Sequence, residues 1–153
     1  MRFPLHCLWA ASAVVLMACA SGAAAQSPVG KTIRAHFTFQ SCGTINGVCG
    51  QPLPGGGNFY ISSEKNVFDY GASAQGTMYR LGVPQHAFNA TITFAMHGNT
   101  ISVTADSGHG GSTTTDYRIQ GDSCVISSRT TYKNVTNRVE APSCTVTEGN
   151  ANK

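Results

Sequence analysis

The chain has 153 residues, of which 11% are charged and 8% aromatic, and its formal net charge at pH 7 is +3. An ordinary globular domain has roughly 25% charged residues. This composition excludes a coiled coil and a charge-rich disordered chain, and the length excludes a multidomain protein. The positive charge is small and scattered, whereas a nucleic-acid-binding surface needs Lys and Arg gathered on one face. We therefore expect one domain that binds no nucleic acid.

Residues 1–25 have the three parts of a secretory signal peptide. Arg2 supplies the positive end, an apolar run follows at residues 8–20, and three alanines offer a cleavage site before Gln26. The apolar run is shorter than the roughly 20 residues that span a bilayer, which argues against a transmembrane span. The sequence thus predicts an exported protein, either periplasmic or secreted.

An alternative processing site lies within the same segment. Residues 16–19 resemble a bacterial lipobox, whose last residue, Cys19, would carry a lipid anchor. A lipoprotein anchored through Cys19 is therefore the alternative to a periplasmic or secreted protein. In either case we expect one β-rich domain at residues 26–153, with residues 26–31 flexible and residues 148–153 a frayed tail.

Four cysteines remain after removal of the signal peptide, and an even number in an exported chain is typical of disulfides. Of the three pairings, the sequence favours Cys42 with Cys49, which encloses a turn containing Gly and Asn, and Cys124 with Cys144, which ties the C-terminal strands together. A zinc site formed by these cysteines is the alternative to disulfides. However, the chain has no C-x₂-C pair, and its histidines share no metal-binding spacing. We expect two disulfides, no metal and no cofactor.

Alternating apolar and polar residues predict β-strands along nearly all of the domain. The clearest are a strand at residues 32–40 and a hairpin at residues 90–105 that turns at Gly98 and Asn99. Residues 41–57 contain several Gly and Pro residues and are expected to be irregular. Further strands are expected at residues 58–62, 67–70, 77–81, 113–120, 124–132 and 137–147. The prediction is an all-β fold, a small antiparallel sandwich or barrel of about 8–10 strands.

Several short motifs resemble a group of small uncharacterised bacterial exported β-rich proteins with paired Ser-Cys strand motifs. The motifs are Tyr60-Ile61-Ser62-Ser63, Gly98-Asn99-Thr100-Ile101, Ser123-Cys124 and Ser143-Cys144. The resemblance implies export and a β fold, and it assigns no activity and no catalytic residue.

The segment at residues 106–111 resembles the nucleophile loop of a chymotrypsin-like protease, with Ser107 as the serine. However, His109 separates the glycines, and the domain is too short for the two barrels of that fold. We interpret the segment as a Gly-rich loop between strands. The acidic residues are dispersed, and their spacing predicts no glycosidase pair.

The function predicted from the sequence is that of an exported, non-catalytic β-domain that binds an envelope component, a glycan or a protein, a class that includes enzyme inhibitors. The candidate binding residues are Ile45 and Val48 in the first disulfide loop, and Tyr60 and Tyr70 in an aromatic patch. The alternative is a purely structural role, in which the loop ends a strand and the tyrosines pack in the core. The alternative function is a small periplasmic hydrolase that uses Ser107 or a carboxylate pair.

Overall fold

The computed structural model of the chain describes residues 26–71 and 73–153. The predicted signal peptide at residues 1–25 and the lipobox cysteine, Cys19, lie outside the described residues, so both stay predictions.

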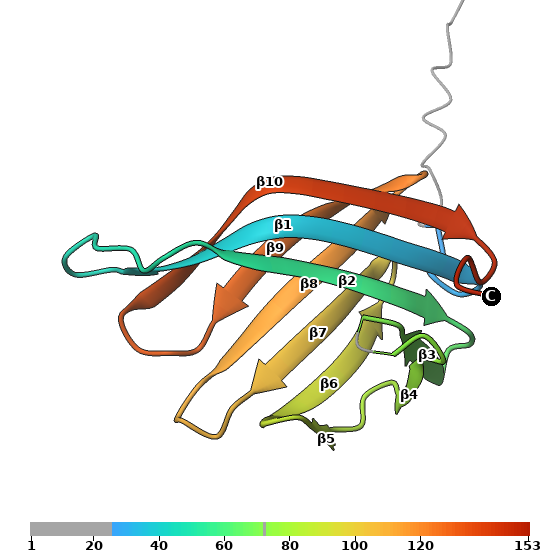
Figure 1. Cartoon of the computed structure of the whole chain (residues 1–153), viewed down its shortest axis with the longest axis horizontal. Coiled ribbons are helices and arrows are strands. Elements are labelled where there is room, and N and C mark those ends of the chain that lie inside the picture. The colour runs from blue at the N-terminus through green and yellow to red at the C-terminus, as the bar shows by residue number, and fades with distance from the viewer. Residues whose placement is uncertain (1–25, 72) are drawn as a thin grey trace, which may run out of the picture.

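Ten strands and no helix make up the regular structure of the described residues. They form two antiparallel sheets of five strands each (Figure 1). The all-β prediction is confirmed, and because the sheets are not closed into a barrel, the architecture is the sandwich alternative. Sheet A has the order β10-β1-β2-β3-β4, and sheet B has the order β5-β6-β7-β8-β9. In chain order the strands are β1 (Lys31–Gly43), β2 (Leu53–Ile61), β3 (Asn66–Asp69), β4 (Thr77–Arg80), β5 (Gln85–Ala87), β6 (Ala90–His97), β7 (Thr100–Asp106), β8 (Ser112–Gln120), β9 (Ser123–Thr130) and β10 (Val135–Glu148).

The last strand returns to the first, since β10 pairs with β1 along its whole length. The register shifts once, between His36 and Thr38 of β1, where β10 carries an extra residue. Ala141 has a φ of 47° at this point and precedes Pro142. A bulge of this kind takes the proline out of the hydrogen-bond ladder. β10 therefore continues through Pro142.

The inner faces of the two sheets meet in an apolar core. Phe59 of β2 packs edge to face against Phe94 of β6 and Tyr117 of β8, with ring centroids 5.7 and 5.0 Å apart. Such pairs contribute roughly 0.5–1.5 kcal/mol beyond the area that they bury. These rings therefore join the two sheets near the C-terminal half of β2. The aliphatic residues buried around them are Ile33, Ile61, Val67, Ile101, Ile119 and Val146.

The structure corrects the expectation that residues 41–57 are irregular. β1 extends to Gly43 and β2 begins at Leu53, so that Gly56 lies opposite His36 in a regular ladder. Glycine has a low intrinsic strand preference, and for this reason the sequence predicted an irregular segment. Pairing with β1 overrides that preference. The sequence also missed β5, which is three residues long and gives no periodic signal.

The structure contains two disulfides, Cys42–Cys49 and Cys124–Cys144, which are the pairings that the sequence favoured. The first closes the connection between β1 and β2, and we call residues 43–52 the disulfide loop. The second links β9 of sheet B to β10 of sheet A, so it ties the two sheets together covalently. Two disulfides fit an oxidising location.

The C-terminal residues 149–153 fold back against β1. The hydroxyl of Thr32 donates to the carbonyl oxygen of Gly149 at 2.6 Å and accepts from the N–H of Ala151 at 3.0 Å. The guanidinium of Arg34 donates to the carbonyl oxygen of Ala151. These contacts hold the end of the chain on the outer face of sheet A.

Candidate functional site

One half of β2 has a neighbour on one side only. β3 and β4 are four residues long, and β3 pairs only with Phe59, Tyr60 and Ile61 of β2. Residues 53–57 pair with β1 on one side and with no strand of the described residues on the other. Figure 1 shows β3 and β4 beside the C-terminal end of β2 only. This part of sheet A therefore has an open edge.

A groove runs along this edge between the two sheets and consists of two adjoining cavities. One, which we call the aromatic cavity, has a volume of about 450 Å³, and the other, the threonine cavity, about 290 Å³. Both are lined by Gly56, Val103 and Tyr117, so they adjoin at these residues, and we call the two together the groove. The remaining walls of the threonine cavity are Phe37, Phe39, Leu53, Pro54, Gly55, Ala105, Thr113 and Thr115.

Two glycines of β2 allow aromatic rings of the groove to lie against the strand. A Cβ on Gly55 would lie 2.4 Å from the ring of Phe37, and a Cβ on Gly57 would lie 2.5 Å from the ring of Phe59. Both distances are far below ordinary van der Waals contact, so any larger residue would displace a ring. Because the inner face of β2 has no side chain at these two positions, the rings of Phe37 and Phe59 pack directly against its backbone.

Tyr117 joins the sheets at the point where the cavities meet. Its hydroxyl donates to the carbonyl oxygen of Gly56 at 3.3 Å. Burial raises the pKa of Tyr117 above its usual value, and the negative charge of Asp69 raises it further. The phenol therefore stays protonated and remains a hydrogen-bond donor at neutral pH.

Asp69 is an acidic residue on the inner face of sheet A. It lies directly opposite Phe59, and directly opposed residues of an antiparallel pair share a face. Its carboxylate lines the aromatic cavity and accepts from the N–H of Gly71 at 2.9 Å. Burial raises the pKa of the Asp69 carboxyl, and the hydrogen bond from Gly71 opposes that shift. Sequence reasoning missed this residue.

The binding residues predicted from the sequence lie in three separate places. Tyr70 lines the aromatic cavity, and its hydroxyl accepts from the amide of Asn150 at 2.9 Å. Tyr60 alternates with the inward-facing Phe59 and lies on the outer face of sheet A. Ile45 and Val48 are 81% and 65% exposed in the disulfide loop. Only Tyr70 is thus part of the groove.

Ser107, the serine of the alternative hydrolase, lies outside the groove in the loop between β7 and β8. Its hydroxyl is 2.8 Å from the hydroxyl of Tyr132. Asp106 accepts from the N–H of Gly108 at 2.7 Å, which is a local turn contact. Within residues 26–71 and 73–153, no imidazole or carboxylate is hydrogen-bonded to Ser107.

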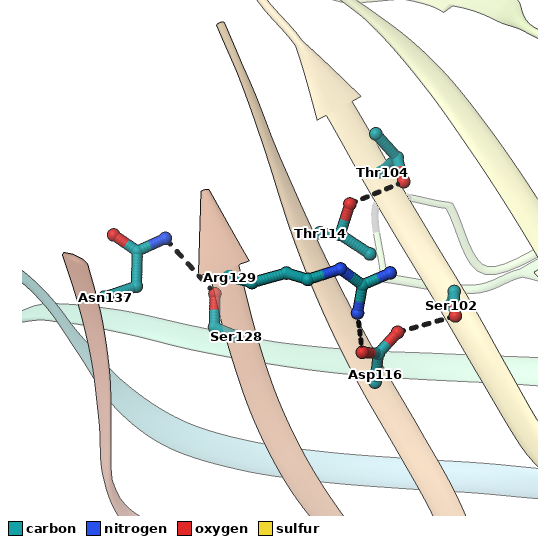
Figure 2. A network of polar contacts seen from close by, with 7 residues as sticks. All are labelled: Ser102, Thr104, Thr114, Asp116, Ser128, Arg129 and Asn137. Atoms are coloured by element: carbon teal, nitrogen blue, oxygen red, sulfur yellow. Dashed lines mark hydrogen bonds and ion pairs between the residues drawn. The ribbon is translucent and has the colours of Figure 1, made fainter. Parts of the chain in front are cut away.

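A polar network covers the outer face of sheet B. Figure 2 shows the carboxylate of Asp116 between Ser102, which donates to it at 2.6 Å, and Arg129, with which it forms an ion pair. Thr104 and Thr114 are hydrogen-bonded at 2.8 Å beside it. Asp116 thus has two side-chain partners and points away from the core, whereas Asp69 points inward from the other sheet. These two carboxylates do not form a catalytic pair.

No protein-family model, curated protein or solved structure matches this chain. The described part of the chain has no group of three or more His, Cys, Asp or Glu residues placed to hold a metal ion. It also has no helix that is long and apolar enough to cross a membrane. The candidate site is therefore assigned from geometry alone, and it is the groove.

Proposed function

We propose that this chain is an exported, non-catalytic binding domain that takes an extended polypeptide segment of an envelope or extracellular protein into the groove. The observation that carries the proposal is the open edge of β2 at residues 53–57, which borders the groove. An exposed sheet edge binds an extended peptide through main-chain hydrogen bonds, while neighbouring pockets take alternate side chains.

The backbone direction of β2 supports this binding mode. The carbonyl oxygen of Asn58 accepts from the N–H of Tyr70 at 2.7 Å, so the backbone groups of Asn58 point away from β1. Strand residues two positions apart direct their backbone groups to the same side. The N–H of Gly56 therefore points toward the open edge, where an incoming strand would pair with it. The C=O of Gly56 already accepts from Tyr117 and keeps one further lone pair for the incoming strand.

The side chains around the edge favour a partly apolar segment. Leu53 is 56% exposed at the mouth of the threonine cavity. Phe39 and Ala105 add apolar wall, and Thr113 and Thr115 supply hydroxyl groups. Ile45 and Val48 are also exposed, in the disulfide loop that precedes β2. Burial of such side chains contributes roughly 25 cal/mol per Å² of apolar area removed from water.

Location outside the cytoplasm is part of the proposal. It is supported by the predicted signal peptide and by the two disulfides, which fit an oxidising compartment. A lipoprotein anchored through Cys19 would place the same groove at a membrane surface.

The test is selection of a displayed random nonapeptide library against the purified protein. We expect enrichment of a related set of peptides whose binding is lost in Leu53→Asp. Met78→Asp is the matched control, because Met78 is 49% exposed on β4 and does not line the groove. The bound peptide should also slow hydrogen exchange of the Gly56 amide.

Enrichment of no peptide, or equal binding to wild type and Leu53→Asp, would contradict the proposal. The alternative hydrolase makes a different prediction: a fluorophosphonate probe would label the protein, and Ser107→Ala would abolish the label.

A further inference from the structure

Among residues 26–71 and 73–153, no positively charged side chain forms an ion pair with the carboxylate of Asp69. The two ion pairs of the described residues are Lys31 with Glu148 and Arg129 with Asp116. Asp69 instead accepts one backbone hydrogen bond, from Gly71. A partly buried carboxylate loses part of its hydration, which a cation or further hydrogen-bond donors can replace. Asp69 therefore lacks the partner that its position calls for.

The walls around this carboxylate are aromatic. Phe59, Tyr70, Phe94 and Tyr117 all line the same cavity of about 450 Å³. The hydroxyl hydrogen of Tyr117 is directed to the carbonyl oxygen of Gly56, whereas the hydroxyl oxygen of Tyr70 accepts from the amide of Asn150. Aromatic faces carry partial negative charge and attract cations within about 6 Å of the ring centre. The cavity thus combines one anion with several electron-rich rings.

We propose that the aromatic cavity binds an organic cation, a primary ammonium or guanidinium group, with Asp69 as its counter-charge. Such a group supplies the hydrogen-bond donors and the positive charge that Asp69 lacks, and it fits the aromatic walls better than a neutral or anionic group. This inference rests on the proposed function in one respect: the cation would be a Lys or Arg side chain of the bound segment, placed at the inner end of the groove.

The turn contact of Asp69 does not account for its position. Asp106 makes the same contact, accepting from the N–H two residues ahead, at the exposed end of β7. A turn contact therefore needs neither burial nor aromatic neighbours. What distinguishes Asp69 from Asp106 is the cavity, and Asp106 consequently provides the matched control.

The experiment is an NMR titration of the purified protein with benzylammonium chloride and, separately, with benzyl alcohol. The two probes have similar shape and differ in charge. We expect benzylammonium to shift the resonances of Asp69, Gly71 and other residues of the aromatic cavity, and benzyl alcohol to bind at least about tenfold more weakly. Asp69→Asn should weaken benzylammonium binding by a similar factor, whereas Asp106→Asn should leave it unchanged.

Equal binding of the two probes to wild type would overturn the inference without any variant, so it stays testable even if Asp69→Asn does not fold. Equal benzylammonium binding to wild type and Asp69→Asn, or shifts outside the aromatic cavity, would also overturn it. The outcomes separate this inference from the proposed function. If the enriched peptides contain no Lys or Arg and benzylammonium does not bind, the proposed function is supported and the cation site is refuted. If benzylammonium binds and no peptide is enriched, the cation site is supported and the proposed function is refuted.

Discussion

Replacement of Gly56 by alanine tests whether the glycine segment is a strand paired with β1. The new Cβ would lie 2.5 Å from the backbone carbonyl oxygen of Ala35, which cannot move without disturbing the ladder. Overpacking costs roughly 1–3 kcal/mol, and we take the upper end because the obstacle is backbone. Alanine recovers about 0.5–1 kcal/mol by restricting the unfolded chain. We expect Gly56→Ala to lower the free energy of unfolding by about 2 kcal/mol.

Urea unfolding of the purified protein, followed by circular dichroism, measures this loss. Gly50→Ala is the matched control, since its Cβ would lie 3.7 Å from the nearest atom, the carbonyl oxygen of Ser41, which is ordinary contact. The control should be as stable as wild type or slightly more stable. If Gly56→Ala and Gly50→Ala unfold at the same urea concentration, the pairing of residues 53–57 with β1 is refuted.

Three further predictions concern stability. Phe88 has a φ of 57° in the turn between β5 and β6 and is 80% exposed, so Phe88→Gly should raise the free energy of unfolding by about 1 kcal/mol; an unchanged urea midpoint would contradict this. Burial raises the pKa of Asp69 above its ordinary value of 3.8, so the folded state binds this proton more tightly than the unfolded state. The free energy of unfolding of the wild type therefore falls as the pH rises from 3.8 through the raised pKa. Asp69→Asn should therefore gain stability relative to wild type over that interval in urea unfolding, and a difference independent of pH would rule the argument out. Replacement of Cys124 and Cys144 by alanine should lower the free energy of unfolding by about 3 kcal/mol for their separation of 20 residues, and a midpoint equal to that of the oxidised wild type would count against it.

The hairpin of β6 and β7 shows what local sequence determines. Its apolar residues alternate, and Gly98 adopts a φ of 58° at the turn, so both strands could be predicted to within about one residue. The glycines at residues 55–57 carry no comparable signal, because glycine has no side chain to mark a face. Their strand depends on β1, and pairing between distant segments cannot be deduced from a local pattern.

The candidate site was predictable only in part, for the same reason. Tyr70 was chosen from its nearness to other aromatic residues, and it lines the aromatic cavity. Asp69 is one of seven acidic residues with no distinctive spacing. Only its register opposite Phe59 places it inside the sandwich, and that register requires knowledge of how β2 and β3 pair.

The pairing of β1 with β10 determines when the domain can finish folding. Thr32 and Gly149, which are hydrogen-bonded, are 117 residues apart in the sequence. Folding slows as the sequence separation of contacting residues grows, because a long loop must close before the contacts form. A chain that ends before residue 135 lacks β10 and leaves β1 as an unprotected edge, open to pairing with other chains. Sheet A is therefore completed only after β10 has been synthesised, and the chain remains incompletely folded until then.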